Sequence, residues 1–251
     1  MTLLGIDTST PASAACVLRD DGSAVEVEPR PARLSEGPAH ARELMPAVAD
    51  VMQRAGVEFG DLEAIAVGVG PGTFTGLRIG IATARALASS SGLPLRPVSS
   101  LAALAEGMRE AGAPPRGRAA SERVTSDRSA SAPDRSASAR LLPLIDARRA
   151  ELFAALFEPT GERLWAPFVA APEAIAERVR EGGFTARAAG DGSIRFRGVL
   201  EAAGIGVDAD ESRSHVVRAL HVCRLAQAVP DQPPEAVLPD YLRTPDAKPS
   251  S

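Results

Sequence analysis

Two short turns carry residue types that are able to bind a phosphate group. The first turn spans residues 7–10 after a short apolar segment, and the second spans residues 70–76 after a continuous apolar run. An acid at the end of a strand can hold a metal-bound phosphate, and free amides of a tight turn or helix start can bind its oxygens. Asp7, Thr8 and Ser9 are therefore candidate nucleotide- or phosphate-binding residues. The alternative is ordinary turn chemistry, in which Asp and Ser side chains bond to neighbouring amides.

A helix is expected to begin at the second turn and to run to about residue 91. Thr73 is placed to cap its N-terminus, which leaves free amides pointing out of the helix start. Gly76 and Gly80 give this helix a narrow face of small residues. Arg78 and Arg85 lie on a partly charged face beside it. An interior glycine costs ~1 kcal/mol relative to alanine, so two in the first turns indicate close packing, either on this protein's own sheet or on a partner helix.

The segment 38–55 is expected to form another helix, and this one has two apolar faces. Leu44 and Val48 belong to its main apolar stripe, whereas Met45 and Met52 lie on a second face. Two apolar faces indicate either deep burial or a protein interface, and methionines suit an interface because their side chains adapt.

The elements that position these residues form two halves. The first half is expected to contain strands at 3–7, 12–18, 23–28, 63–70 and 95–98 and helices at 38–55, 73–91 and 99–111. The second half is expected to contain strands at 141–145, 150–158 and 185–189 and helices at 171–181 and 211–228. A doubly wound dinucleotide-binding fold alternates strand and helix from its first strand, and this order does not. We expect an N-terminal lobe at 1–98 and a C-terminal lobe at 99–251, with the helix at about 211–228 returning to the N-terminal lobe.

The segment 113–140 interrupts the pattern of strands and helices. It is rich in Arg, Ser, Ala and Pro and contains a seven-residue repeat at 127–133 and 134–140. Val124 is its only bulky apolar residue, so the sequence predicts a disordered insertion. Its basic character leaves open a contact with RNA, although a tolerated insertion is the simpler interpretation.

Composition excludes several classes of protein. The 251 residues carry a formal net charge of −4, and Lys248 is the only lysine among 28 basic residues. A P-loop, a Schiff base or a Ser-Lys dyad needs a well-placed lysine. The chain has no apolar run near the ~18–20 residues of a membrane span and no basic, apolar leader at its start, so we expect a cytoplasmic protein. Cys16 and Cys223 are expected to be reduced core residues.

Six segments together resemble the TsaB (YeaZ) family of bacterial tRNA threonylcarbamoyladenosine biosynthesis proteins. They are residues 5–10, 40–46, 70–80, 97–104, 146–153 and 239–247. The resemblance implies an α/β, two-lobed fold like those of actin, Hsp70 and sugar kinases, with mixed sheets flanked by helices. It also implies a role in threonylcarbamoyl transfer to the tRNA adenosine next to the anticodon.

In that family TsaB is the non-catalytic partner of a paralogous transferase, TsaD, and the ATPase TsaE joins them. The resemblance therefore implies a scaffold and activator that is not itself an enzyme and needs no cofactor. Its expected partners are a TsaD-like transferase, a TsaE-like ATPase and a second copy of the chain, with tRNA contacted through the complex. The expected partner-binding residues are His40, Leu44, Met45, Val48, Met52, Thr73, Thr75, Gly76, Arg78, Gly80 and Arg85.

No metal site is expected where the transferase has one. The His-x-x-x-His motif of TsaD would fall on Ser100 and Leu104, and leucine cannot bind a metal. His215 and His221 are six residues apart, which is the wrong spacing for one helix face. Residues 190–193 are the nearest candidate for a second phosphate loop, and a turn into a helix is the alternative.

Two other functions remain open at the level of the sequence. One is a nucleotide-dependent carbamoyl transferase or kinase that acts through Asp7 and the turn at 70–76. The other is an RNA-binding subunit that uses the arginine-rich insertion.

Overall fold

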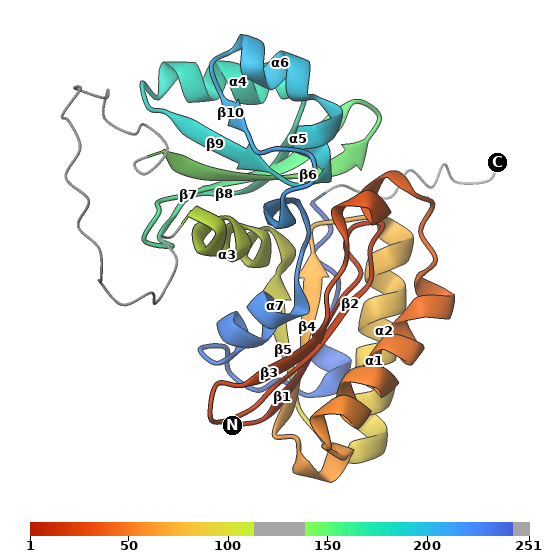
Figure 1. The fold of residues 1–251 in the computed structure, drawn as a ribbon. Coiled ribbons are helices and arrows are strands. Elements are labelled where there is room, and N and C mark those ends of the chain that lie inside the picture. Colours follow the sequence, from red (N-terminus) through yellow and green to blue (C-terminus); the bar gives the residue numbers. More distant parts are fainter. Residues whose placement is uncertain (113–138, 243–251) are drawn as a thin grey trace, which may run out of the picture.

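The structure is a computed structural model that describes residues 1–112 and 139–242 (Figure 1). Two five-stranded sheets form the centres of two lobes, as the sequence predicts for an α/β fold with mixed sheets. The expected insertion at 113–140 falls largely on residues 113–138, which lie outside the described residues, and β6 begins at Arg140. Within the part of the chain described, no helix has both the length and the apolarity needed to cross a membrane.

The first sheet has the strand order β3-β2-β1-β4-β5. Its strands are β1 (Leu3–Asp7), β2 (Ala14–Leu18), β3 (Ala24–Val27), β4 (Ala64–Gly70) and β5 (Leu95–Ser99). The first three form the antiparallel meander, and β4 and β5 continue the sheet in parallel with β1. Every residue of β1 is buried because helices cover both faces of this sheet.

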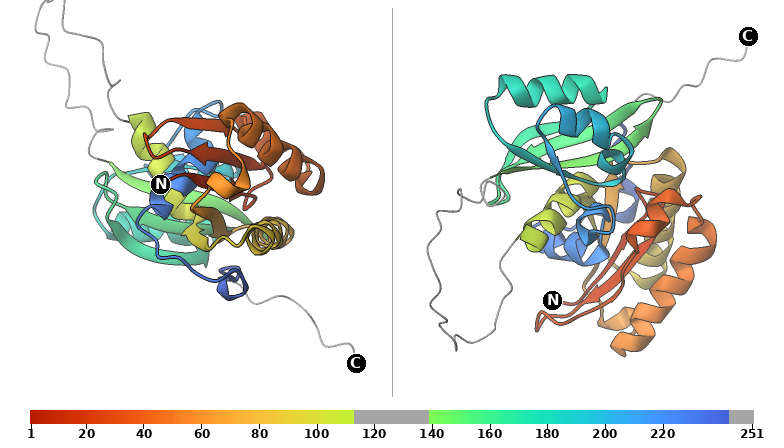
Figure 2. Two further views of the ribbon diagram at one scale, coloured as in Figure 1. Left: turned by 90° about the horizontal axis from the view of Figure 1, so that it is seen from below. Right: turned by 45° about the horizontal axis from the view of Figure 1, so that its top comes forward.

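Two pairs of helices cover the first sheet. On one face lie α1 (His40–Ala55) and α2 (Phe74–Ser91), which run side by side (Figure 2). Leu4 and Ile6 of β1 point into this layer, whereas Leu3 points to the opposite one. On that opposite face lie α3 (Ser100–Gly112) and α7 (Ala219–Ala226). Alternation along β1 therefore supplies apolar side chains to both layers.

The second sheet has the strand order β10-β9-β6-β7-β8. Its strands are β6 (Arg140–Arg148), β7 (Glu151–Phe157), β8 (Arg163–Ala170), β9 (Ala186–Ala189) and β10 (Gly206–Val207). The helices α4 (Pro172–Glu181), α5 (Asp191–Arg195) and α6 (Arg197–Ala202) belong to this lobe. One of the two buried faces of β6 and β7 continues the apolar core of α3, so α3 lies between the two sheets.

The structure differs from the sequence-based expectation at the start of α7 and in three elements that were not expected, the helix α6 and the strands β8 and β10. The helix expected at about 211–228 is shorter, because α7 starts at Ala219 after a 3-10 turn and an extended Arg218. Ser212 favours a local turn at the expected helix start, since its hydroxyl accepts the amide of Ser214. β8 lies at a sheet edge, contains Pro167 and is largely half-exposed or exposed, so its sequence lacks a clear apolar alternation.

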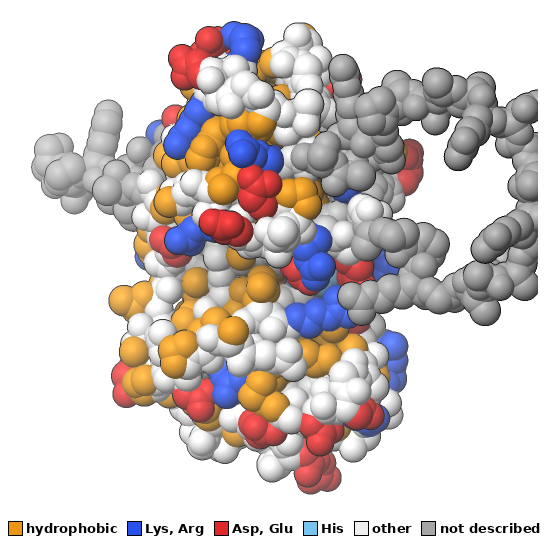
Figure 3. Space-filling model, turned by 90° about the vertical axis from the view of Figure 1, so that its left-hand side faces the viewer, with side chains coloured by type: hydrophobic (Ala, Val, Ile, Leu, Met, Phe, Trp, Pro, Cys, Tyr) orange, Lys and Arg blue, Asp and Glu red, His pale blue; other side chains and the backbone are white. Residues whose placement is uncertain are grey.

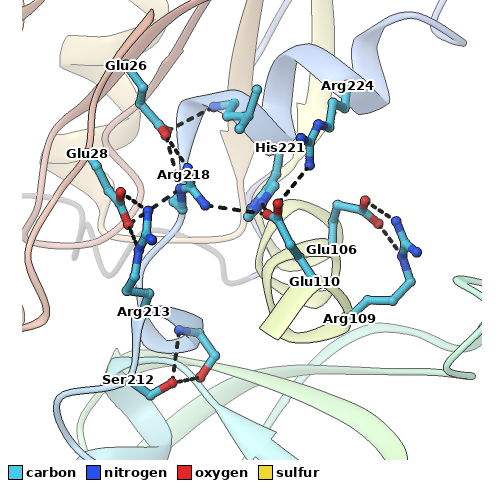
Figure 4. A network of polar contacts seen from close by, with 12 residues as sticks. Glu26, Glu28, Glu106, Arg109, Glu110, Ser212, Arg213, Arg218, His221 and Arg224 are labelled. Carbon is cyan, nitrogen blue, oxygen red and sulfur yellow. Dashed lines mark hydrogen bonds and ion pairs between the residues drawn. The ribbon is translucent and has the colours of Figure 1, made fainter. Parts of the chain in front are cut away.

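A network of ion pairs joins α7 and the segment before it to β3 and α3 (Figure 4). Arg218 donates to Glu26 from both Nη2 and Nε, at 2.6 and 3.0 Å, and it approaches Glu110 at 3.4 Å. His221 Nε2 lies 2.7 Å from the same Glu110 carboxylate. Acidic and basic side chains also lie close together near the junction of the lobes on the face in Figure 3. Paired charges therefore help to hold α7 against the first lobe.

Replacing Arg218 with glutamine is expected to lower the free energy of unfolding by about 3 kcal/mol. The reason is that the Glu26 side chain is only 8% exposed and would keep its buried charge without its main partner. Urea denaturation would measure the loss. Arg54→Gln is the control, because its pair with Asp50 is half-exposed and is expected to matter by less than about 0.5 kcal/mol. Equal effects of the two substitutions would contradict the prediction.

Candidate functional site

The Asp7 turn is closed by its own hydrogen bonds. Asp7 Oδ1 accepts the amide and the hydroxyl of Ser9 at 2.8 and 2.6 Å, and Oδ2 accepts the hydroxyl of Ser100 at 2.8 Å. Asp7 is 1% exposed, and Thr8 and Ser9 are buried with it. Desolvation raises the pKa of Asp7 above 3.8, although the bonds from Ser9 and Ser100 oppose this shift. This arrangement is the turn chemistry that the sequence left as an alternative to phosphate binding.

The second turn packs directly on the first one. Thr73 N donates to Ser9 O at 2.8 Å, and a Cβ atom on Gly72 would lie only 2.4 Å from that same oxygen. Gly72 is therefore needed for the close approach of the two turns. Thr73 does occupy the N-cap position of α2 with an extended backbone, but its side chain makes no capping hydrogen bond. The backbone amide of Thr73 therefore forms a hydrogen bond within the chain and is not free to bind a phosphate.

Several expected partner-binding residues are buried in the chain's own core. They are His40, Leu44, Val48, Met52, Gly76 and Gly80. Leu44, Val48 and Met52 belong to the core between α1 and the first sheet. His40 Nδ1 lies 2.9 Å from Ser13 Oγ, and the two glycines face Thr8. In this conformation these six residues offer little or no surface to a partner, and their role in partner binding stays a prediction. Met45, Thr75 and Arg78 are exposed, and Thr73 and Arg85 are half-buried.

An exposed group of aromatic and basic side chains lies at the start of α2. The rings of Phe74 and Tyr241 stack with their centroids 5.4 Å apart, and Arg78 Cζ lies 3.9 Å from the Phe74 ring centroid. Arg78 Nε also donates to the Tyr241 hydroxyl at 3.2 Å. Phe74 and Tyr241 are 42% and 38% exposed, which is high for large apolar side chains. We call Phe74, Arg78 and Tyr241 the aromatic patch.

The sequence identified one member of the aromatic patch, Arg78, as a site residue. Tyr241 was missed because it comes from a segment 163 residues further along the chain. That segment is held in place where Asp240 N donates to Val69 O at 2.8 Å. The resemblance of residues 239–247 to a known family was the one signal that could have drawn attention to Tyr241.

The candidate second phosphate loop at 190–193 forms a turn into α5. Gly190 has a φ of 113°, and Ser193 Oγ donates back to its carbonyl at 2.8 Å. Asp191 Oδ1 accepts the amides of Asp146 and Gly192 at 3.1 and 3.0 Å. Desolvation raises the pKa of Asp191 from 3.8 to about 6, and the nearby Asp146 carboxylate adds to the shift. The loop borders a cavity of about 310 Å³ between the lobes.

Asp191→Asn is expected to raise the free energy of unfolding at pH 7 by up to about 3 kcal/mol and to change it little at pH 4. Because the folded pKa lies above the unfolded one, the favourable contribution of Asp191 is complete below pH 3.8 and is lost as pH rises through 6. Asparagine stays neutral and can still accept both amides. Thermal unfolding at both pH values would test this, with the half-exposed Asp50→Asn as control. A less stable variant at pH 7 would contradict the prediction.

The two positions that correspond to the transferase's histidine motif are both buried. Ser100 bonds to Asp7, and Leu104 lies in the core with no exposed surface. Among the residues described, no three His, Cys, Asp or Glu side chains gather closely enough to hold a metal ion. His215 and His221 make separate contacts, with Gly190 and with Glu110.

Comparisons with known proteins find relatives across both lobes. The family model of TsaD, tRNA N6-adenosine threonylcarbamoyltransferase, matches residues 34–121. The TsaB protein of Escherichia coli, a tRNA threonylcarbamoyladenosine biosynthesis protein, is 30% identical over 186 residues, or 72% of this chain and 67% of the relative. The TsaB protein of Haemophilus influenzae is 33% identical over 106 residues, which are 42% of each chain.

The solved structures extend the similarity to the whole fold. YeaZ from Pseudomonas aeruginosa superposes with a TM-score of 0.68 at 30% identity, covering 96% of this chain and 99% of that one. A second Pseudomonas aeruginosa structure, of a protein with similarity to peptidase YEAZ, gives a TM-score of 0.70 at 29% identity with the same coverage. The arrangement of two mixed sheets with flanking helices is thus shared by these proteins and by this chain.

Proposed function

Because the chain belongs to the TsaB (YeaZ) family, we propose that it takes part in the biosynthesis of threonylcarbamoyladenosine in tRNA. In this proposal the chain is a non-catalytic subunit that binds and activates a TsaD-like transferase. The observation that carries the proposal is the 30% identity to Escherichia coli TsaB over 72% of this chain. In this role the protein would act in the cytoplasm and would meet tRNA through the complex.

The closed Asp7 turn supports a non-catalytic role. A carboxylate that is to hold a metal-bound phosphate must present oxygens to the ligand, whereas both oxygens of Asp7 are bonded to serines. Gly68 packs so closely on this group that a Cβ atom there would lie 1.8 Å from Asp7 Oδ2. Opening the site would require the first turn, Gly68 and Ser100 to move together, which disfavours the rival kinase or carbamoyl transferase function.

The aromatic patch supports the proposed contact with a transferase. Tyrosine and arginine side chains contribute strongly to many protein interfaces, and these are already stacked before a partner arrives. Met45 on the adjacent α1 is 47% exposed and could extend the contact. The TsaD family model matches a segment that contains both α1 and α2, so the two proteins would meet through related elements. A TsaE-like ATPase would join this pair, and a second copy of the chain could take the transferase's place when it is absent.

Reconstitution tests the proposal directly. Threonylcarbamoyl transfer to tRNA would be measured with a purified TsaD-like transferase and a TsaE-like ATPase, with and without this chain. We expect transfer only when the chain is present, and no transfer from the chain alone. Full transfer without the chain would overturn the proposal. So would stoichiometric Mg-ATP turnover by the isolated chain that disappears in Asp7→Ala, because this result would favour the enzymatic alternative.

A further inference from the structure

The cavity between the lobes has a lining that the proposed function does not use. Its volume is about 310 Å³, which lies at the lower end of the range for small-molecule sites. It is lined by charged side chains of the second lobe and by apolar side chains of both lobes. The lining residues are Pro11, Leu34, Ser35, Asp146, Arg148, Asp191, Ile194 and Arg195.

Two arginines of this cavity converge on one carboxylate oxygen. Arg195 Nη1 and Arg148 Nη1 lie 2.7 and 3.3 Å from Asp146 Oδ2. Asp146 is buried, whereas the two arginine side chains are 46% and 57% exposed. Among the described residues, neither guanidinium makes a further hydrogen bond, so each keeps donors for a ligand. Asp146 therefore acts as a fixed anchor that holds two guanidinium groups at the cavity.

The hairpin that carries Arg148 has an unusual backbone. Arg148, Arg149 and Ala150 have φ values of 65°, 51° and 60°, and they are the only non-glycine residues with positive φ in the described part of the chain. This left-handed region is unfavourable for residues with a Cβ atom. Arg148 N donates to Asp146 Oδ1 at 2.8 Å, which ties the left-handed turn to the same carboxylate. Strained backbone of this kind is concentrated at functional sites.

Asp191 faces this group from the start of α5. Its carboxylate accepts the Asp146 amide, and the Asp146 carboxylate is close enough to raise the pKa of Asp191. Asp146 and Arg148 of β6 lie close enough to Asp191 to shift its pKa, and Arg195 of α5 lines the same cavity. His215 Nδ1, in the 3-10 turn before α7, accepts the amide of Gly190 next to Asp191. When Asp191 is protonated, Arg148 and Arg195 are balanced only by the Asp146 carboxylate that they bond to, so this group carries one net positive charge.

We propose that the interlobe cavity binds a small organic anion with one carboxylate and an apolar body. The carboxylate would bridge Arg148 and Arg195 beside a protonated Asp191, and the body would lie on Pro11, Leu34 and Ile194. Ion-paired arginine forks suit a planar carboxylate. A polyphosphate fits poorly, because it would bring several negative charges against Asp146 and Asp191 and would find the Asp7 turn closed.

The affinity of this cavity for a carboxylate is also expected to depend on pH. A ligand carboxylate is repelled by ionised Asp191 and accepts a hydrogen bond from protonated Asp191. Binding therefore takes up a proton, and affinity falls as pH rises through the pKa of about 6.

Calorimetric titration of the full chain with butyrate tests the site, with butyramide as the uncharged ligand of the same shape. We expect butyrate to bind at pH 5.5 with a Kd on the order of 1 mM, and butyramide about tenfold more weakly. Arg195→Gln should weaken butyrate by about tenfold or more. Arg180→Gln is the matched control, because Arg180 is exposed on α4 and pairs with Glu177 outside the cavity lining.

The pH dependence separates this site from general attraction to arginines. Butyrate affinity should fall about tenfold from pH 5.5 to 7.5 in the natural chain and stay constant in Asp191→Asn. Equal binding of butyrate and butyramide, or equal loss in Arg195→Gln and Arg180→Gln, would overturn the proposal. Tighter binding of inorganic phosphate or Mg-ADP than of butyrate would overturn it as well, since the cavity would then select phosphate.

Discussion

Replacing Gly76 with alanine is expected to lower the free energy of unfolding by about 4 kcal/mol or more, although alanine is the better helix former. A Cβ atom at this position would lie 2.0 Å from the carbonyl oxygen of Thr8 and 2.5 Å from Thr73 Oγ1. The Thr8 carbonyl belongs to the backbone of the first turn, which is fixed by the bonds of Asp7. The clash therefore cannot be relieved by rotating a side chain.

Alanine substitutions at Gly198 and Gly80 serve as a control and as an intermediate case for the loss of stability. Gly198 lies in α6 with nothing within 4 Å of its would-be Cβ atom, so Gly198→Ala is expected to be neutral or to stabilise by up to about 1 kcal/mol. At Gly80 the nearest atom is Thr8 Oγ1 at 2.2 Å, which can rotate away if it gives up its bond to Gly76 O. Urea denaturation should thus rank the losses as Gly76, then Gly80, then Gly198. A Gly76→Ala protein as stable as Gly198→Ala would contradict the packing described here.

The secondary structure of the first lobe could be predicted closely because each element has a strong local signal. The continuous apolar run of β4 ends at Gly70, and α1 and α2 end where Gly56 and Gly92 adopt left-handed backbone. Such signals are absent around α7, where Ser212 and the extended Arg218 replace the expected helix start. Apolar spacing alone does not reveal a side chain that closes a turn on its own backbone.

The candidate site was harder to predict, because its contacts are made between distant segments. The small face of α2 indicated close packing, but the sequence could not distinguish an external helix from the chain's own first turn. The structure shows that Gly76 and Gly80 face Thr8. For the same reason, the stacking of Tyr241 on Phe74 could not be predicted from residue spacing. It depends on the path that the last described segment takes over α2.

Charge reversal or truncation in the aromatic patch is expected to weaken binding to a TsaD-like transferase by about 100-fold. In Tyr241→Ala the Phe74 ring loses its stacking partner, and Arg78 loses the hydroxyl that holds it at 3.2 Å. In Arg78→Glu a carboxylate replaces the guanidinium that lies on the face of Phe74. Because Arg78 and Tyr241 both lie on the surface, and Tyr241 is 38% exposed, neither change should unfold the chain. Calorimetry or surface plasmon resonance with the purified transferase would measure the loss.

Ser89→Glu supplies the control, since it places a carboxylate on an exposed position of the same helix at a distance from the patch. We expect this variant to bind the transferase as the natural chain does. The two patch variants should also be less than additive when combined, because Arg78 and Tyr241 are in direct contact and support one another. If Tyr241→Ala and Arg78→Glu both bind normally while reconstituted transfer still requires the chain, the partner must dock elsewhere on the surface, and the role of the aromatic patch would be wrong even though the proposed function stands.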